Sequence, residues 1–170
     1  FRDTPAPVEI EGYEPEHQTE LAVDFIENNK ENPFFLFLSW GPPHAPYQLV
    51  PEKYKNLYNP ESIQVRPNCQ DEIVDRRVIA DYYAAITALD EYVGTLMDTL
   101  ERLGLADNTL VVFTSDHGDM LFSQGHTKKE RPWEESIRVP LIARYPGVIP
   151  ENRSSDVIFS TVDVMPSILG

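Results

Sequence analysis

The sequence predicts an α/β fold with a mainly parallel sheet flanked by helices. Two unbroken apolar runs, 34–40 and 110–113, are typical of strands covered on both faces, as in a parallel sheet. Between these runs, apolar residues recur at spacings of three and four over 74–103, which is the period of a helix. A strand, a helix and a second strand in this order predict a right-handed crossover unit.

Composition limits the classes of partner. A length of 170 residues fits a single domain, and 41% hydrophobic with 25% charged residues is typical of a globular chain. The formal net charge of -14 opposes binding to nucleic acid and to anionic membranes, and no apolar run is long enough to cross a bilayer. We therefore expect neither partner, and an anionic substrate would need local positive charge. The single cysteine, Cys69, excludes an internal disulfide.

The first element is expected to be a helix. Residues 1–15 are rich in proline and acidic residues, which predicts an extended lead-in, and a chain that begins at Phe1 without an initiator Met is expected to be cut from something longer. Over 16–29 the apolar residues fall on one face, which predicts an amphipathic helix ended by Asn28, Asn29 and then Pro33.

The predicted strand 34–40 leads into the proline-rich segment Gly41–Tyr47. Prolines on both sides of His44 would fix the direction of its imidazole, which favours a functional role. The alternative is a proline-rich loop with an incidental histidine. The polar stretch 49–67 is expected to run over the surface, where it could line a substrate entrance.

The long helix 74–103 is followed by Gly104, the residue expected at a C-terminal cap, and then by the strand 110–113. Asp116 and His117 follow this strand at its carboxyl end, where ligand sites of α/β sheets lie. A carboxylate oxygen and an imidazole nitrogen can both bind a divalent cation. The alternative is that Asp116 caps a turn and His117 makes an ordinary hydrogen bond. Gly118 permits a turn close to them.

The remaining segments are shorter. Residues 120–132 lack periodicity, which indicates an active-site loop or a solvated one. Pro132–Ser136 predicts a short helix, 139–145 a third strand with Pro140 near its start, 157–160 another short strand, and 162–169 the beginning of a helix.

Several segments, in this order along the chain, together resemble the sulfatase family of the alkaline-phosphatase-like superfamily. They are residues 33–38 with 43–46, residues 108–118, Lys129 placed four residues before the segment 133–141, and residues 160–166. The resemblance covers roughly residues 15–170. It implies an alkaline-phosphatase-like fold, of which this chain is an incomplete portion: a single α/β domain over 1–170, truncated at the N-terminus and at the C-terminus.

The resemblance also implies roles for individual residues. Asp116 and His117 would be metal ligands, Lys129 would contact the sulfate group, and His44 would contact the ester oxygen or leaving group, so that His44 and Lys129 are the expected catalytic residues. Lys128 is a rival for the role of Lys129, whose spacing to the following segment fits the family, and His126 is a further expected substrate contact.

A divalent cation is the expected cofactor. Calcium is expected first, but many family members have Asn at the position of His117, and an imidazole suits manganese or zinc better. The family nucleophile is a formylglycine made from a Cys or Ser in a Cys/Ser-x-Pro-x-Arg segment. Cys69 is followed by Gln-Asp-Glu-Ile and does not fit, so the formylglycine is expected in the missing N-terminal part.

The resemblance therefore predicts a portion of a metal-dependent sulfuric ester hydrolase that acts on a sulfated small molecule or glycan, in the periplasm or outside the cell. The 170-residue chain by itself is expected to be inactive because it lacks the nucleophile segment. Two alternatives remain. One is a metal-dependent phosphatase or phosphodiesterase of the same superfamily, since residues 115–118 also resemble segments found there. The other is a non-catalytic carbohydrate-binding or interaction module.

Overall fold

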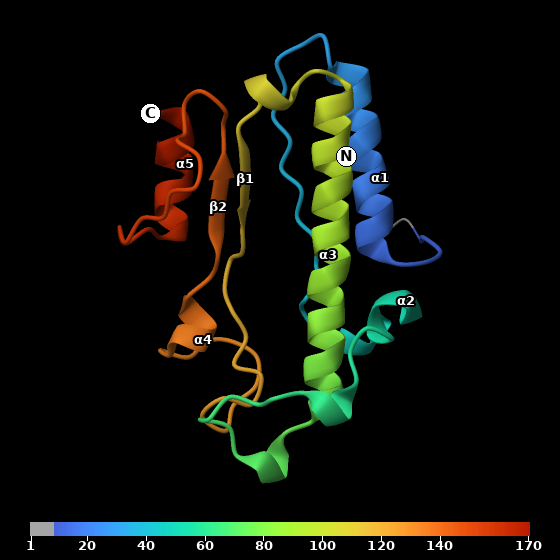
Figure 1. The fold of residues 1–170 in the computed structure, drawn as a ribbon, viewed down its shortest axis with the longest axis vertical. Helices are drawn as coiled ribbons and strands as arrows, with labels where there is room; N and C mark the ends of the chain where they lie inside the picture. Colours follow the sequence, from blue (N-terminus) through green and yellow to red (C-terminus); the bar gives the residue numbers. More distant parts are fainter. Residues whose placement is uncertain (1–8) are drawn as a thin grey trace. The chain divides into compact units, whose positions relative to one another are not determined.

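The structure is a computed structural model that describes residues 9–170 (Figure 1). It divides into two compact units, the first ending at Ala106 and the second spanning Asp107–Gly170. The predicted lead-in lies largely outside the described residues. The expectation of a single domain over 1–170 stays a prediction.

Helices α1 (Glu14–Asn29) and α3 (Arg76–Arg102) pack side by side in the first unit and run in the same direction (Figure 1). They confirm the helices predicted over 16–29 and 74–103. Helix α3 begins where the Asp75 carboxylate accepts the N–H groups of Arg77 and Val78, at 2.9 and 3.4 Å. It ends before Gly104, whose φ of +70° allows the chain to close the helix, as predicted.

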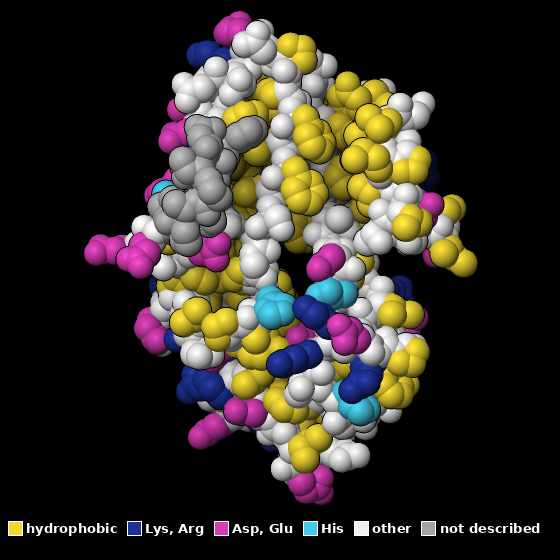
Figure 2. All heavy atoms as spheres, turned by 180° about the vertical axis from the view of Figure 1, so that it is seen from behind, with side chains coloured by type: hydrophobic (Ala, Val, Ile, Leu, Met, Phe, Trp, Pro, Cys, Tyr) yellow, Lys and Arg dark blue, Asp and Glu magenta, His cyan; other side chains and the backbone are white. Residues whose placement is uncertain are grey.

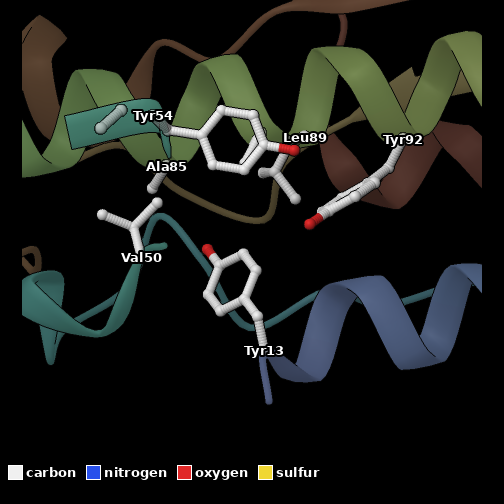
Figure 3. Packing of buried hydrophobic residues seen from close by; sticks show 8 residues of the cluster. Tyr13, Val50, Tyr54, Ala85, Leu89 and Tyr92 are labelled. Atoms are coloured by element: carbon white, nitrogen blue, oxygen red, sulfur yellow. The ribbon is translucent and has the colours of Figure 1, made fainter. Parts of the chain in front are cut away.

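The core of the first unit lies along one face of α3 (Figure 3). Tyr13, Val50 and Tyr54 pack there against five side chains of the helix: Ala84, Ala85, Ala88, Leu89 and Tyr92. Tyr54 belongs to the short helix α2 (Glu52–Lys55), and Val50 directly precedes that helix. The prediction that 49–67 runs over the surface is therefore wrong for Val50 and Tyr54, which are buried in the core.

The strand predicted over 34–40 is not formed, because none of these residues is in a strand in the structure. The exposure of this segment nevertheless alternates with period two: Phe35 and Phe37 are 71% and 80% exposed, and their neighbours are half-buried. A continuous apolar run predicts burial, but a strand also needs a neighbour with which to exchange backbone hydrogen bonds. The predicted strand, helix, strand crossover is consequently not formed either.

The second unit contains strands β1 (Val111–Thr114) and β2 (Leu141–Arg144), which confirm the strands predicted at 110–113 and 139–145. They pair antiparallel, with Val111 opposite Arg144 and Thr114 opposite Leu141 (Figure 1). Within residues 9–170 this two-stranded sheet is the only one, so the mainly parallel sheet is not confirmed.

Two helices of the second unit agree with the sequence. Helix α4 (Glu134–Ile137) confirms the short helix predicted near 132–136, and α5 (Thr161–Leu169) confirms the helix predicted at 162–169. The capping box of Ser160 and Asp163 starts α5. The strand predicted at 157–160 is wrong, since these residues are exposed and outside any strand.

Apolar side chains reach the surface in wide patches, some of which are visible as yellow areas in Figure 2. In the second unit they include Ile142, Val148, Ile158, Val162, Met165 and Leu169. Helices long and apolar enough to cross a membrane do not occur among the described residues.

Candidate functional site

The Asp116–His117 pair follows β1, where the strand leaves the sheet. The Nδ1 atom of His117 lies 2.8 Å from the carbonyl oxygen of Gly118. A carbonyl oxygen only accepts hydrogen bonds, so Nδ1 carries the proton and Nε2 of the neutral ring keeps its lone pair. That Nε2 lies 3.4 Å from Oδ2 of Asp116, whose side chain is 83% exposed. Oδ2 of Asp116 and Nε2 of His117 thus lie close enough to bind one proton or one cation between them.

Local hydrogen bonds hold both side chains of this pair. Oδ1 of Asp116 accepts the backbone N–H of His117 at 3.0 Å, which leaves Oδ2 on the side of the imidazole. The hydroxyl of Ser115 donates to the carbonyl oxygen of His117 at 2.9 Å. The first of these bonds joins Asp116 to the next residue and is not the turn cap of the alternative interpretation, and the second carboxylate oxygen stays on the side of the imidazole.

The donor set of this pair fits part of a metal site. Two ligands bound to one cation at about 2.0–2.4 Å lie roughly 3–3.5 Å apart, as Oδ2 and Nε2 do here. A backbone carbonyl that holds the other ring nitrogen is also typical of metal-binding histidines. No group of three or more His, Cys, Asp or Glu residues positioned for a metal occurs among residues 9–170. That the pair supplies two ligands of a larger set stays a prediction.

Gly118 allows a close approach of the α4 segment. Its backbone N–H donates to the carbonyl oxygen of Ser136 at 2.8 Å, and a Cβ at this position would clash with the carbonyl oxygen of Glu135. The sequence predicts that Gly118 permits a turn, but its φ is not in the left-handed region, and the close packing of Glu135 explains the glycine. The buried Ser136 also accepts the N–H of Arg131 through its hydroxyl at 3.3 Å, a role that the sequence analysis missed.

Residues 119–130 form a tightly folded loop, and that it belongs to an active site stays a prediction. Oδ1 of Asp119 accepts the N–H groups of Leu121 and Lys128, at 2.9 and 3.1 Å. Met120 and Ser123 are fully buried. Six residues of the loop have φ in the left-handed region: Leu121, Phe122, Gln124, Gly125, Lys128 and Glu130.

The loop carries the three remaining candidates of the second unit. Lys129 is half-buried, whereas its rival Lys128 is exposed. The imidazole of His126 stacks on the indole of Trp133, with 5.3 Å between ring centroids and 25° between planes. His126 and Lys129 therefore belong to the same unit as Asp116 and His117.

His44 belongs to the first unit and is exposed. Its Nδ1 lies 2.6 Å from the carbonyl oxygen of Ala45, so Nδ1 carries a proton and Nε2 is the nitrogen available to a substrate. The Pro42–Pro43 and Ala45–Pro46 peptide bonds on either side are cis. That His44 acts together with Asp116 and Lys129 stays a prediction.

Comparison with known proteins identifies the family of the chain. The sulfatase family model matches residues 2–170. The ulvan-active sulfatase of Formosa agariphila is 38% identical over 165 residues, which cover 93% of this chain and 32% of the relative. The N-acetylglucosamine-6-O-sulfatase of Bacteroides thetaiotaomicron is 40% identical over 94 residues, which cover 55% of this chain and 17% of the relative.

A solved structure extends the likeness to the fold. The crystal structure of yidJ from Bacteroides fragilis aligns with a TM-score of 0.89 and 34% identity, covering 98% of this chain and 39% of that one. The chain belongs to the sulfatase family of the alkaline-phosphatase-like superfamily. It spans about one third of the length of the ulvan-active relative that it matches.

Proposed function

We propose that this chain is a portion of a metal-dependent sulfuric ester hydrolase that acts on a sulfated sugar. The observation that carries the proposal is the pair of facing atoms, Oδ2 of Asp116 and Nε2 of His117, at 3.4 Å in a chain of the sulfatase family. The name of the N-acetylglucosamine-6-O-sulfatase supports a sulfated sugar as the substrate class.

Because the chain is acidic, binding of an anionic sulfate ester needs positive charge at the site. Lys129 is half-buried on a hydrogen-bonded loop, and its ammonium group attracts the sulfate oxygens. Asp116 and His117 would hold the divalent cation, calcium in the first place and manganese or zinc as alternatives. When bound, that cation supplies further stabilisation of negative charge on the sulfate oxygens.

His44 is assigned to the leaving group. Its Nδ1–H donates to the carbonyl oxygen of Ala45, which leaves Nε2 as the nitrogen available to the substrate. In the imidazolium form, Nε2–H donates its proton to the departing ester oxygen. His126, stacked on Trp133, is proposed as a further contact to the sugar.

The nucleophile is proposed to lie in a segment outside these 170 residues, where a formylglycine would be made. Cys69 is followed by Gln-Asp-Glu-Ile and does not match the Cys/Ser-x-Pro-x-Arg pattern. We therefore propose that the 170-residue chain alone is inactive. Turnover of an aryl sulfate by the purified chain with millimolar calcium, manganese or zinc, lost in a His44→Ala, Lys129→Ala double variant, would contradict this.

The function is tested by assaying the whole protein on an aryl sulfate and on the matching aryl phosphate, with and without a chelator. We expect a preference for sulfate, loss of activity with the chelator, and a roughly 100- to 1,000-fold lower kcat for Lys129→Ala. A strong preference for phosphate would replace the sulfatase by a phosphatase or phosphodiesterase. Metal-independent binding of a sulfated sugar without turnover, measured by calorimetry, would indicate a non-catalytic module.

A further inference from the structure

Asp119 has no role in the assignments above, yet two distant parts of the loop meet at its carboxylate. Its Oδ1 accepts the N–H of Leu121, two residues on, and that of Lys128, nine residues on. The next residue, Met120, donates its N–H to the carbonyl oxygen of Lys128 at 2.7 Å. Both polar atoms of the Lys128 backbone are therefore held by the consecutive residues Asp119 and Met120.

The backbone around Lys129 needs such support. Lys128 and Glu130, on either side of it, have φ values of 64° and 68°. The left-handed region is disfavoured for residues that carry a Cβ. Such conformations persist only where surrounding contacts determine them. The hydrogen bonds from residues 119 and 120 are contacts of this kind.

We propose that Asp119 is a positioning residue for Lys129. Its carboxylate closes the loop by holding the N–H groups of Leu121 and Lys128, and this fixes the point from which the Lys129 side chain departs. The proposal rests on the proposed function only in assigning Lys129 to the sulfate group. What the loop requires from Asp119 is an acceptor oxygen at the right position, and not its negative charge.

A competing explanation is that the charge of Asp119 matters, for example because it neutralises a cation near Asp116. Two substitutions separate these explanations. Asp119→Asn removes the charge but keeps an Oδ1 acceptor at the same reach. Asp119→Glu keeps the charge but moves the acceptor by one methylene group.

Both variants are made in the whole protein and assayed on an aryl sulfate over a range of calcium concentrations. We expect Asp119→Asn to keep kcat/KM close to wild type. We expect Asp119→Glu to lower it roughly 10- to 100-fold, because small misplacements of a charged group are costly in catalysis. The calcium dependence should be unchanged in both.

A double variant tests whether Asp119 acts through Lys129. If it does, Asp119→Glu should cost little more once Lys129 is already Ala, since coupled residues give non-additive effects. Additive losses would overturn the proposal, as would a fall in the Asn variant equal to that in the Glu variant.

Hydrogen exchange provides a readout that does not need activity. The amides of Leu121 and Lys128 should exchange faster in Asp119→Glu than in wild type, and at nearly wild-type rates in Asp119→Asn. If wild type fails to hydrolyse sulfate esters, the proposed function is wrong, and the exchange rates alone decide on the loop closure. If wild type is active and both amides keep their protection in Asp119→Glu, the positioning role is wrong.

Discussion

The first unit buries its apolar side chains mainly on helices, whereas the second unit buries them in a loop. In the first unit, α3 alone contributes eight of the buried apolar residues: Ile79, Ala80, Ala84, Ala85, Ala88, Leu89, Tyr92 and Leu100. In the second unit, within Asp107–Gly170, the buried apolar residues are Met120, Leu121 and Phe122, all in the loop that carries Lys129. The candidate functional loop is thus also the best-buried part of its unit, so its substitutions should affect stability and activity together.

The largest effect is expected from removing a methionine side chain from this loop. Met120 is fully buried and Met165 of α5 is 61% exposed. Met120→Ala should lower the free energy of unfolding of the 170-residue chain by about 3 kcal/mol. The matched Met165→Ala should change it by less than about 0.5 kcal/mol. Urea denaturation measures both, and an equal cost for Met165→Ala would show that the loop is not the core of its unit.

The second effect concerns two glycines, one in each unit. Gly118→Ala should cost about 2 kcal/mol, because its Cβ must displace the carbonyl oxygen of Glu135. Gly94, inside α3, has open space around it, so Gly94→Ala should raise stability by roughly 0.5–1 kcal/mol through the entropy of the unfolded chain. Thermal unfolding of the two variants should move the midpoint in opposite directions. A tolerated Gly118→Ala would contradict the close approach of α4.

The third effect weakens the helical unit without touching the loop. Asp75→Ala removes the acceptor for the N–H groups of Arg77 and Val78 and should cost about 1 kcal/mol. Asp75→Asn keeps an acceptor and should be close to neutral. In the whole protein, activity at a temperature well below unfolding should be equal in both variants. Lower activity in Asp75→Ala alone would mean that the start of α3 also supports the site.

The smallest effect is a pH dependence within α3. Asp81 is buried, its Oδ1 has no hydrogen-bond partner, and desolvation raises the pKa of its carboxyl, against the opposing charges of Lys55 and Arg77. A pKa raised by folding means that the folded state binds the proton more tightly, so stability falls as pH rises from the unfolded pKa through the folded one. Asp81→Asn should therefore stabilise the chain at pH 7, and its gain should disappear below about pH 3.9. Urea titrations at pH 7 and at pH 3 measure the difference, and a constant gain would contradict the assignment.

Periodicity predicted the helices well, because the signal is local. The apolar spacing over 74–103 gives the period of the helix and Gly104 marks its end, whereas the start of α3 at the Asp75 cap is seen only in the structure. The failure at 34–40 has an equally physical cause. An unbroken apolar run indicates that side chains are buried, whereas a strand also needs hydrogen-bond partners elsewhere in the chain. The antiparallel pairing of β1 with β2 is likewise not encoded in the local sequence.

The sequence indicates candidate site residues where chemistry is carried by the side-chain type. Asp116, His117, Lys129 and His44 stand out for their ligand, cationic or acid–base character and for their resemblance to a family motif, and their roles stay predictions. Asp119 and Ser136 were missed because each acts through hydrogen bonds to the backbone. The bond from Leu121 to Asp119 could have been found as an Asx turn, but the bond from Lys128 spans nine residues and carries no sequence signal.

The alternating exposure of residues 34–40 has a consequence for how the chain behaves in concentrated solution. This stretch holds three phenylalanines, two leucines and a tryptophan without a charged residue, and it forms no strand with the described remainder of the chain. Uncovered segments of this composition are templates for pairing between molecules, as in aggregation at sheet edges. The purified 170-residue chain should therefore self-associate as its concentration rises, and Phe35→Lys or Phe37→Lys on the exposed side should suppress this without unfolding the α1–α3 pair.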